Sequence, residues 1–136
     1  MIIYSDSADN VTVAQLDGFF VGWLNPPDPA THLAILKNSY SIWIAIDSEA
    51  DNRVVGFINA VSDRVLSAYL PLLEVLPDYQ KRGIGSELVK RMLAGLDQFY
   101  MIDLTCDDNM VKFYEALGLK KYIAMMKRNF ERQSGV

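Results

Sequence analysis

The sequence predicts an α+β fold. Its mixed sheet is mostly antiparallel, has a parallel crossover at its centre and is flanked by four helices. Three apolar, strand-like runs follow one another in the first half of the chain, and only short polar turns separate them. A long amphipathic helix then precedes the next strand, which allows that strand to join the sheet in parallel. These two observations define the fold class.

The first 40 residues predict a short edge strand and two helices. Residues 1–4 are an apolar start, and Thr12 can cap a helix that runs through Leu16 and Phe20 at helical spacing. Three prolines then interrupt any helix, since proline lacks a donor and restricts the residue before it. A second short helix is predicted over residues 31–37.

The next part of the chain predicts a three-stranded meander followed by alternating helices and strands. Strand-like runs cover residues 41–46, 53–61 and 66–76, and the turns between them are polar. From there the chain reads helix, strand, helix and final strands. The predicted ranges are 84–96 for the helix, 100–106 for the strand, 109–117 for the second helix, 119–128 for one or two strands and 131–136 for a frayed tail.

Size and composition predict one globular domain over residues 1–136, because 51% hydrophobic and 22% charged residues is an ordinary globular balance. The net charge of −4 argues against nucleic acid as a partner, since phosphate-backbone binding needs clustered Lys and Arg. Cys106 and His32 are the single residues of their types, so we expect no disulfide and no metal site. Without a signal peptide or a membrane span of roughly 18 to 20 apolar residues, we expect no membrane partner and a cytoplasmic location.

The junction between the meander and the long helix carries the clearest chemical signal. The first N–H groups of a helix have no intrachain acceptor, and with the helix dipole they form a site for an anion such as a pyrophosphate. Gly83 and Gly85 allow phosphates to approach the backbone, and Lys81 and Arg82 add positive charge. The alternative is an ordinary strand-to-helix turn with two permissive glycines.

Two other phosphate-binding motifs fit this junction less well. A Walker A loop fails, because no Gly-Lys-Ser/Thr follows at the required distance. A dinucleotide fingerprint matches in part, with Gly83 and Gly85 spaced correctly and Asp103 about 20 residues further on. However, Leu88 replaces the third glycine, and a long meander precedes the motif.

The run Gln80-Lys81-Arg82-Gly83-Ile84-Gly85 resembles the cofactor motif of the GNAT superfamily, the Gcn5-related N-acetyltransferases, which is Arg/Gln-x-x-Gly-x-Gly/Ala after the fourth strand. Downstream, residues 113–119 resemble the second signature of that family, Phe-Tyr-x-x-x-Gly-Phe, with Leu119 in place of the last Phe. The resemblance covers roughly residues 41–128. It implies transfer of an acetyl group from acetyl-CoA to a primary amine of a small molecule or peptide, by direct attack in a ternary complex.

By this resemblance, the pantetheine arm of acetyl-CoA would bind main chain at Leu73 and Val75. The diphosphate would bind the residues of the motif, namely Gln80, Lys81, Arg82, Gly83, Ile84, Gly85 and Ser86. Relatives often carry a cofactor-contacting Asn seven residues before the signature tyrosine. Here Asp107 stands in that place and Asn109 follows two residues later, so the contact is expected from one of these two.

Direct transfer needs a neutral amine, help for the developing oxyanion and a proton for the leaving thiolate. The resemblance gives the last role to Tyr114, with a buried aromatic of purely structural purpose as the alternative. Glu74 is the candidate base or water relay, and otherwise an outward-facing or salt-bridged carboxylate. Trp23, Asn25 and Tyr69 are expected to line the acceptor pocket.

A second reading is a non-catalytic module that senses acyl-CoA. Tyr114 and Glu74 favour the enzyme, because binding alone requires neither residue. The acceptor amine stays open, since the fold does not select it. Dimers are common among relatives, so the resemblance also allows a homodimer.

Overall fold

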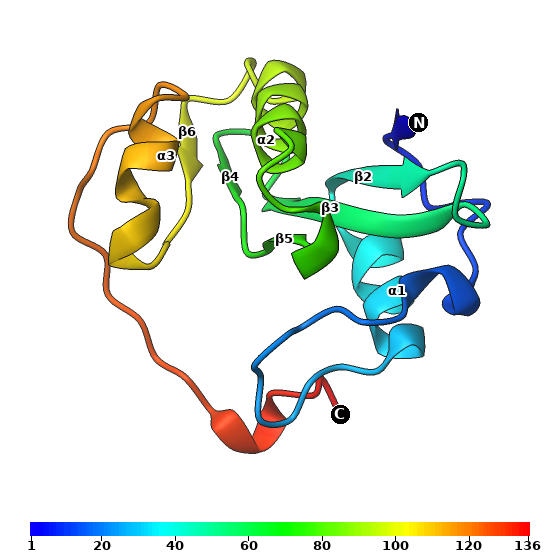
Figure 1. The fold of residues 1–136 in the computed structure, drawn as a ribbon. Helices are drawn as coiled ribbons and strands as arrows, with labels where there is room; N and C mark the ends of the chain where they lie inside the picture. The colour runs from blue at the N-terminus through cyan, green and yellow to red at the C-terminus, as the bar shows by residue number, and fades with distance from the viewer.

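The computed structural model describes all 136 residues and contains one six-stranded sheet with the order β1-β2-β3-β4-β6, in which β5 also pairs with β3 (Figure 1). The strands are β1 (Ile2–Ser5), β2 (Ser41–Asp47), β3 (Arg53–Ser62), β4 (Ser67–Tyr69), β5 (Leu73–Val75) and β6 (Met101–Asp103). The α-helices are α1 (Pro29–Asn38), α2 (Ile84–Gly95) and α3 (Val111–Glu115). Single 3-10 turns are η1 (Val13–Leu16), η2 (Pro77–Tyr79), η3 (Asp108–Met110) and η4 (Phe130–Arg132).

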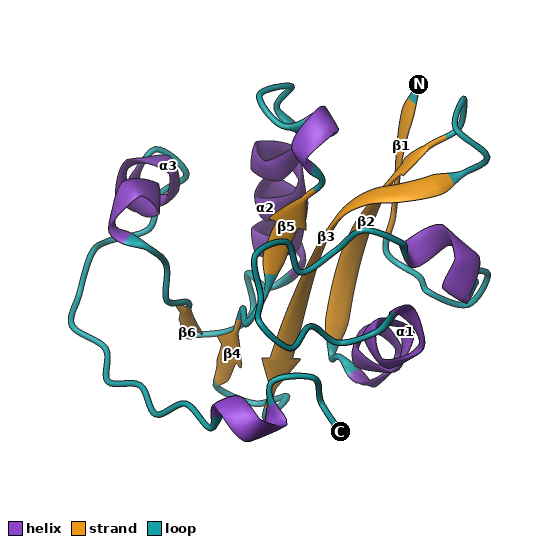
Figure 2. Ribbon diagram, turned by 60° about the horizontal axis from the view of Figure 1, so that its bottom comes forward, coloured by secondary structure: helices purple, strands orange, loops and turns teal.

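The long strand β3 is buried on both faces because helices cover both sides of the sheet (Figure 2). Gly56 faces α2, and a Cβ at this position would lie 3.2 Å from Leu88 Cδ1 and 3.3 Å from Ile84 Cγ2. The next residue, Phe57, faces α1, where its ring lies 4.3 Å from that of His32. The absence of a side chain at Gly56 therefore lets the first turns of α2 approach the sheet closely.

The N-terminal region contains one α-helix rather than the two predicted from the sequence. Thr12 does begin a helical turn, and its N–H donates to Gln15 Oε1 at 2.8 Å, but η1 ends at Leu16. Gly18 (φ 92°) and Phe20 (φ 63°) then adopt left-handed backbone conformations that an α-helix cannot contain. The prediction of four flanking helices was therefore wrong, and three are present.

Helix α1 begins two residues earlier than predicted, at Pro29. The carboxylate of Asp28 accepts a hydrogen bond from the N–H of Thr31 at 2.8 Å and so caps the helix. Proline is well suited to the first helical position, because its missing N–H would have no partner there. The proline-rich stretch that separates the two predicted helices thus also starts the second one.

The predicted strand over residues 66–76 is two strands, β4 and β5, both antiparallel to β3. The break contains Pro71, which has no N–H to donate. On β3, the buried side chain of Asn59 accepts a hydrogen bond from the N–H of Leu72 at 3.1 Å, while the backbone N–H of Asn59 donates to the carbonyl of Leu72 at 3.2 Å. Its amide nitrogen donates to Ser39 Oγ at 3.1 Å, so the break is held from the α1 side as well.

The parallel crossover is confirmed, because β6 pairs with β4 in parallel after the intervening helix α2. It lies at the edge of the sheet and not at its centre, since β6 is the last strand in the order. The strands predicted over residues 119–128 are absent, and nothing extends the sheet beyond β6. The predicted frayed tail is also corrected, because it includes part of η4, and Gln133 Oε1 accepts a hydrogen bond from the N–H of Asn25 at 2.8 Å.

Candidate functional site

The sheet opens between β5 and β6. The last backbone hydrogen bond between the two sides runs from the N–H of Leu70 to the carbonyl of Asp103, at 2.9 Å. Beyond it, β5 continues along β3, while the chain after β6 leaves the sheet towards α3 (Figure 1). One edge of β5 is consequently left without a neighbouring strand.

The open edge of β5 presents unpaired backbone groups. The N–H of Leu76 donates to Val55 and the carbonyl of Leu72 accepts from Asn59, so both residues point their backbone towards β3. Backbone groups alternate in direction along a strand, which places those of Leu73 and Val75 on the opposite, open edge. These are the two residues that the sequence predicted to bind the cofactor arm.

Helix α2 begins with free N–H groups beside this edge. The N-cap residue Gly83 is left-handed (φ 81°, ψ 5°), and no side chain caps the helix. The first intrahelical bond runs from the N–H of Glu87 to the carbonyl of Gly83, at 3.0 Å. The N–H groups of residues 84–86 therefore have no acceptor within the chain and can bind an anion.

The side chains of the motif hold its loop in shape. Gln80 Nε2 donates to the carbonyl of Val75 at 3.0 Å, which ties the motif to the end of β5. Arg82 donates to the carbonyl of Asp78 at 2.9 Å and lies over the ring of Tyr79. Lys81 is exposed and, with φ of 62°, adopts a backbone conformation uncommon outside glycine. Gln80 and Arg82 thus support the backbone that would bind a diphosphate.

Tyr114 lies on α3, on the other side of the opening. Burial, with a smaller contribution from the nearby Cys106 thiol, raises the pKa of the Tyr114 phenol to about 12. Its hydroxyl makes no hydrogen bond within the chain. The neighbouring Phe113 ring lies 3.8 Å from the position that a Cβ would take at Gly85, so α3 rests on the first turn of α2.

Glu74 points away from α2, to the opposite face of β5. Its Oε1 accepts from the N–H of Phe20 at 2.7 Å, and its Oε2 accepts from the N–H of Val21 at 3.2 Å. The carboxylate therefore fixes the loop that follows η1. Each oxygen keeps a lone pair, so a role as base or water relay stays a prediction.

The predicted acceptor-pocket residues divide between this loop and β4. Trp23 is 38% exposed, and its ring packs 4.9 Å from that of Phe20, next to the Glu74 anchor. Asn25 follows in the same loop. Tyr69 lies on β4, where its hydroxyl is 2.9 Å from Thr105 Oγ1, across the parallel strand pair. Trp23 therefore lies near Glu74. Tyr69 instead forms a hydrogen bond with Thr105, in the segment that leads from β6 to α3.

The two polar residues proposed before the signature tyrosine lie at the start of the α3 region. Asn109 is exposed within η3, and Asp107 is the residue that precedes this turn, without a side-chain cap bond. Neither side chain makes a hydrogen bond within the chain. The roles of Asn59 and Thr105 were not predicted from the sequence. A single polar Asn within the apolar run 53–61 could have indicated a special role for Asn59.

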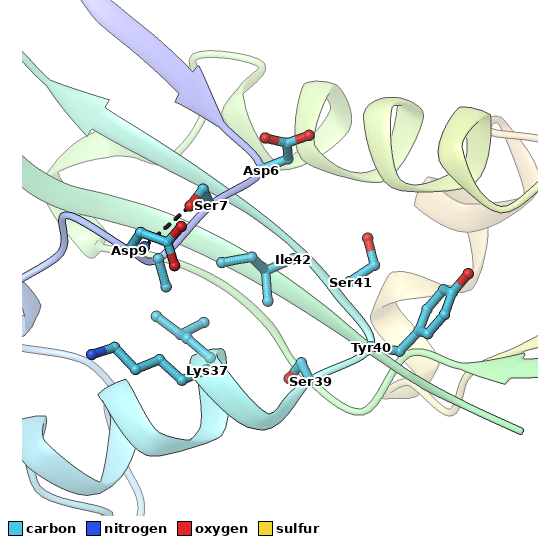
Figure 3. Close-up of a pocket in the computed structure, with 10 residues that line it drawn as sticks. Asp6, Ser7, Asp9, Lys37, Ser39, Tyr40, Ser41 and Ile42 are labelled. Atoms are coloured by element: carbon cyan, nitrogen blue, oxygen red, sulfur yellow. Dashed lines mark hydrogen bonds between the residues drawn. The ribbon is translucent and has the colours of Figure 1, made fainter. Parts of the chain in front are cut away.

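Two surface hollows lie apart from the motif. The larger, of about 390 Å³, lies between the segment after β1 and the end of α1, where Lys37 and Tyr40 line it and the N–H of Asp9 donates to Ser7 Oγ (Figure 3). The second, of about 350 Å³, lies between residues 16–20 and 26–32. The second lies beside the loop that carries Trp23 and Asn25, but neither hollow is lined by a residue of the predicted site.

His32 forms part of the second hollow and is fully buried among the rings of Phe19, Phe20 and Phe57. Burial lowers the pKa of its imidazole to about 4, and neither ring nitrogen has a hydrogen-bond partner. The ring is therefore neutral at pH 7. It acts as a packing residue of the loop that Glu74 fixes.

Similarity to known proteins establishes the family of the chain. The model of the acetyltransferase (GNAT) family matches residues 8–119, and the chain belongs to this family. A candidate acetyltransferase from Deinococcus radiodurans is 46% identical, with a TM-score of 0.95 over 99% of this chain and 93% of its own. An uncharacterized N-acetyltransferase of Pyropia yezoensis is 28% identical over 88% of this chain and 71% of its own. None of the helices combines the length and the apolar character that a bilayer crossing demands.

Two other matches are named for different substrates. A histone acetyltransferase of Glycine max is 35% identical over 88% of this chain, which spans only 56% of that relative. An aminoglycoside acetyltransferase from a soil metagenome, solved with sisomicin, shares the fold with a TM-score of 0.66 at 18% identity. The structural match confirms the fold, while the family rests on the match to residues 8–119.

Proposed function

We propose that the protein is an N-acetyltransferase that moves an acetyl group from acetyl-CoA to a primary amine of a small molecule or peptide by direct attack in a ternary complex. The uncapped N-terminus of α2 beside the open edge of β5 carries this proposal. A diphosphate and an amide-bearing arm are what these two features bind. Because Gln80 joins them, both ends of one cofactor can be held at once.

The residues present fit coenzyme A. The N–H groups of residues 84–86 would hold the diphosphate, with Lys81 as an exposed positive charge nearby. The unpaired backbone groups of Leu73 and the N–H of Val75 would pair with the amides of the pantetheine arm, as an added strand would, while the carbonyl of Val75 accepts from Gln80. When bound, acetyl-CoA supplies an acetyl thioester, which is an activated acyl donor.

Tyr114 would protonate or hydrogen-bond the sulfur that leaves. With a pKa of about 12, its phenol remains protonated throughout the neutral range and is available as a donor. A thiol has a pKa of about 8.5, well below that of this phenol, so stabilisation by a hydrogen bond is favoured over complete transfer. The free hydroxyl has no competing partner within the chain.

Glu74 would attract the amine as a cation and accept its proton, directly or through water. Its carboxylate is already oriented by two backbone N–H groups from the loop that carries Trp23. One residue would thus both shape the acceptor loop and receive the proton. The named relatives act on different amines, so we leave the acceptor at the level of a primary amine.

A thiol-release assay against a panel of amines tests the proposal, with Tyr114→Phe as the diagnostic variant. The turnover number of this variant should fall at least about 100-fold, because a proton or hydrogen-bond donor is lost. Affinity for coenzyme A, measured by calorimetry, should hardly change. In the unmodified enzyme, ionisation of this phenol should cause no loss of rate below pH 10.

The matched control is Tyr100→Phe, which removes a hydroxyl from a side chain that is 83% exposed and should retain full activity. Full activity of Tyr114→Phe would refute the role of this tyrosine. Tight coenzyme A binding without thiol release on any amine would instead favour the acyl-CoA sensor. Absence of coenzyme A binding would contradict both readings.

A further inference from the structure

The residue before the cofactor motif, Tyr79, is hydrogen-bonded to the last residue of β2. Its hydroxyl donates to Asp47 Oδ2 at 2.6 Å, although 32 positions separate the two residues in the sequence. An O–H···O⁻ bond of this length is charge-assisted and belongs to the stronger hydrogen bonds in proteins. Because β2 lies between β1 and β3, the bond joins the start of the motif to an inner strand of the sheet.

Asp47 is itself held in one position. Its Oδ1 accepts a hydrogen bond from the N–H of Glu49 at 3.0 Å, and its backbone pairs with Ile2 on one side and Arg53 on the other. The side chain is only 15% exposed, which leaves it little room for another conformation. The hydrogen bonds from Tyr79 and from the Glu49 N–H lower the pKa of the Asp47 carboxyl, so it is ionised at neutral pH. A charged acceptor therefore lies at a fixed place beside the Tyr79 hydroxyl.

The loop between Tyr79 and α2, residues 80–83, has a backbone that needs support. Lys81 and Gly83 are both left-handed, with φ of 62° and 81°. Left-handed backbone at a residue other than glycine persists only where the surrounding structure holds it. The shape of this loop sets the direction of the free N–H groups that follow it in α2.

Hydrogen bonds from the loop itself are local. Gln80 Nε2 donates to a carbonyl five residues away, and Arg82 donates to a carbonyl four residues away. The bond between Tyr79 and Asp47 is the hydrogen bond that connects residues 77–83 with a distant part of the chain. The position of the loop relative to the sheet therefore depends on it.

The ring of Tyr79 transmits this support to the end of the loop. The guanidinium carbon of Arg82 lies 5.0 Å from the centre of the Tyr79 ring, within the range of a cation–π contact. Arg82 directly precedes Gly83, the N-cap residue of α2. A ring that is fixed through its hydroxyl thus fixes the side chain next to the N-cap.

We propose that Asp47 is a positioning residue for the diphosphate site, which acts through the Tyr79 hydroxyl and does not touch the cofactor itself. The inference rests on the proposed binding of coenzyme A at residues 84–86. A loop that is already held in its bound shape loses less conformational freedom when the diphosphate binds, so the affinity is higher. The effect concerns binding and not the chemical step, because neither Asp47 nor Tyr79 is among the residues proposed to move a proton.

Calorimetric titration with coenzyme A and with pantetheine tests this role. Asp47→Ala and Tyr79→Phe remove the bond from its two sides, and Tyr79→Phe keeps the ring next to Arg82. Each variant should bind coenzyme A about 10-fold more weakly. Pantetheine lacks the diphosphate and should bind both variants as it binds the unmodified chain. The Michaelis constant for acetyl-CoA should rise, while the turnover number and the Michaelis constant for the amine stay constant.

The two substitutions should not add, because they remove the same bond. Asp47→Ala in the Tyr79→Phe background should therefore weaken coenzyme A binding no further. The matched control is Glu49→Ala, which removes a carboxylate from the same turn and changes the net charge equally. Its side chain is 82% exposed, and the variant should keep the full affinity for coenzyme A.

Unchanged coenzyme A affinity in Asp47→Ala and Tyr79→Phe would overturn the role of Asp47 and leave the proposed function intact. An equal loss of pantetheine binding would reveal a general structural defect and would also overturn it, as would additive losses in the double variant. An unmodified chain that does not bind coenzyme A would overturn both this role and the proposed function.

Discussion

Residues 1–99 and residues 100–136 differ in how they are stabilised. All 27 buried residues belong to the first region, which holds the sheet from β1 to β5 and the helices α1 and α2. The second region contributes β6, α3 and the extended segment 119–129, and none of its apolar side chains is fully buried. The comparison indicates that the first region supplies most of the stability of the chain.

The proposed site joins these two regions. The anion-binding start of α2 and the open edge of β5 belong to the well-packed region, whereas Tyr114 belongs to the weakly packed one. Binding of coenzyme A should therefore survive changes that displace α3, while acetyl transfer should not.

Core truncations in the two regions should show the largest difference. Leu88→Ala removes a fully buried side chain of α2 and should lower the free energy of unfolding by about 2–5 kcal/mol. Leu117→Ala removes a half-buried side chain after α3 and should cost less than about 1.5 kcal/mol.

Urea unfolding of each variant, at the same protein concentration as the unmodified chain, measures both losses. The slope of unfolding against urea should stay constant, because neither change alters the surface exposed on unfolding by much. Equal losses for the two leucines would show that the second region is packed as firmly as the first.

Much of the first region could be predicted from the sequence because local pattern and tertiary packing agree there. Apolar residues at helical spacing from Ile84 predicted α2, and the glycine motif indicated where this uncapped helix begins. The failures have particular causes. Left-handed backbone at Gly18 and Phe20 ended η1, and Asn59, whose pairing is invisible in sequence, accompanied the break between β4 and β5.

The second region was harder to predict, because its strand-like pattern at residues 119–128 has no partner in the same chain. Apolar spacing identifies a segment that can form a strand, but it does not identify the edge that completes it. For the candidate site, Leu73, Val75 and the motif lie at one opening, and their binding of the cofactor stays a prediction. It could not show that Glu74 binds the loop or that Gln80 binds Val75.

Lowering the pH should first reduce the stability of the well-packed region, through protonation of His32. Its pKa lies near 4 in the folded chain and near 6.5 when unfolded, so the unfolded state binds the proton first. Stability is therefore fully present above pH 6.5 and is lost as the pH falls towards 4, by roughly 1–3 kcal/mol. Unfolding by urea at pH 7 and at pH 4.5 measures this loss.

His32→Leu is the matched variant, because it keeps an apolar ring-sized volume and has no proton to bind. Its stability should change little between pH 7 and pH 4.5. Carboxylates such as Asp63, whose pKa is lowered by backbone N–H donors, contribute only at lower pH. A variant that keeps the full acid loss would show that another group causes it.

The smallest effect should come from one of the hydrogen bonds between the two regions, the bond between the hydroxyls of Tyr69 and Thr105. Tyr69→Phe leaves the ring on β4 and removes this bond, which should cost about 0.5–1.5 kcal/mol. Because the bond lies where β6 turns towards α3, the loss should appear as faster exchange of the β6 amides, with β3 unchanged. Thr105→Val, which removes the same bond from the other side, should give the same pattern. Uniformly faster exchange throughout the chain would show that the two regions unfold as one unit and that the contrast in packing has no counterpart in local stability.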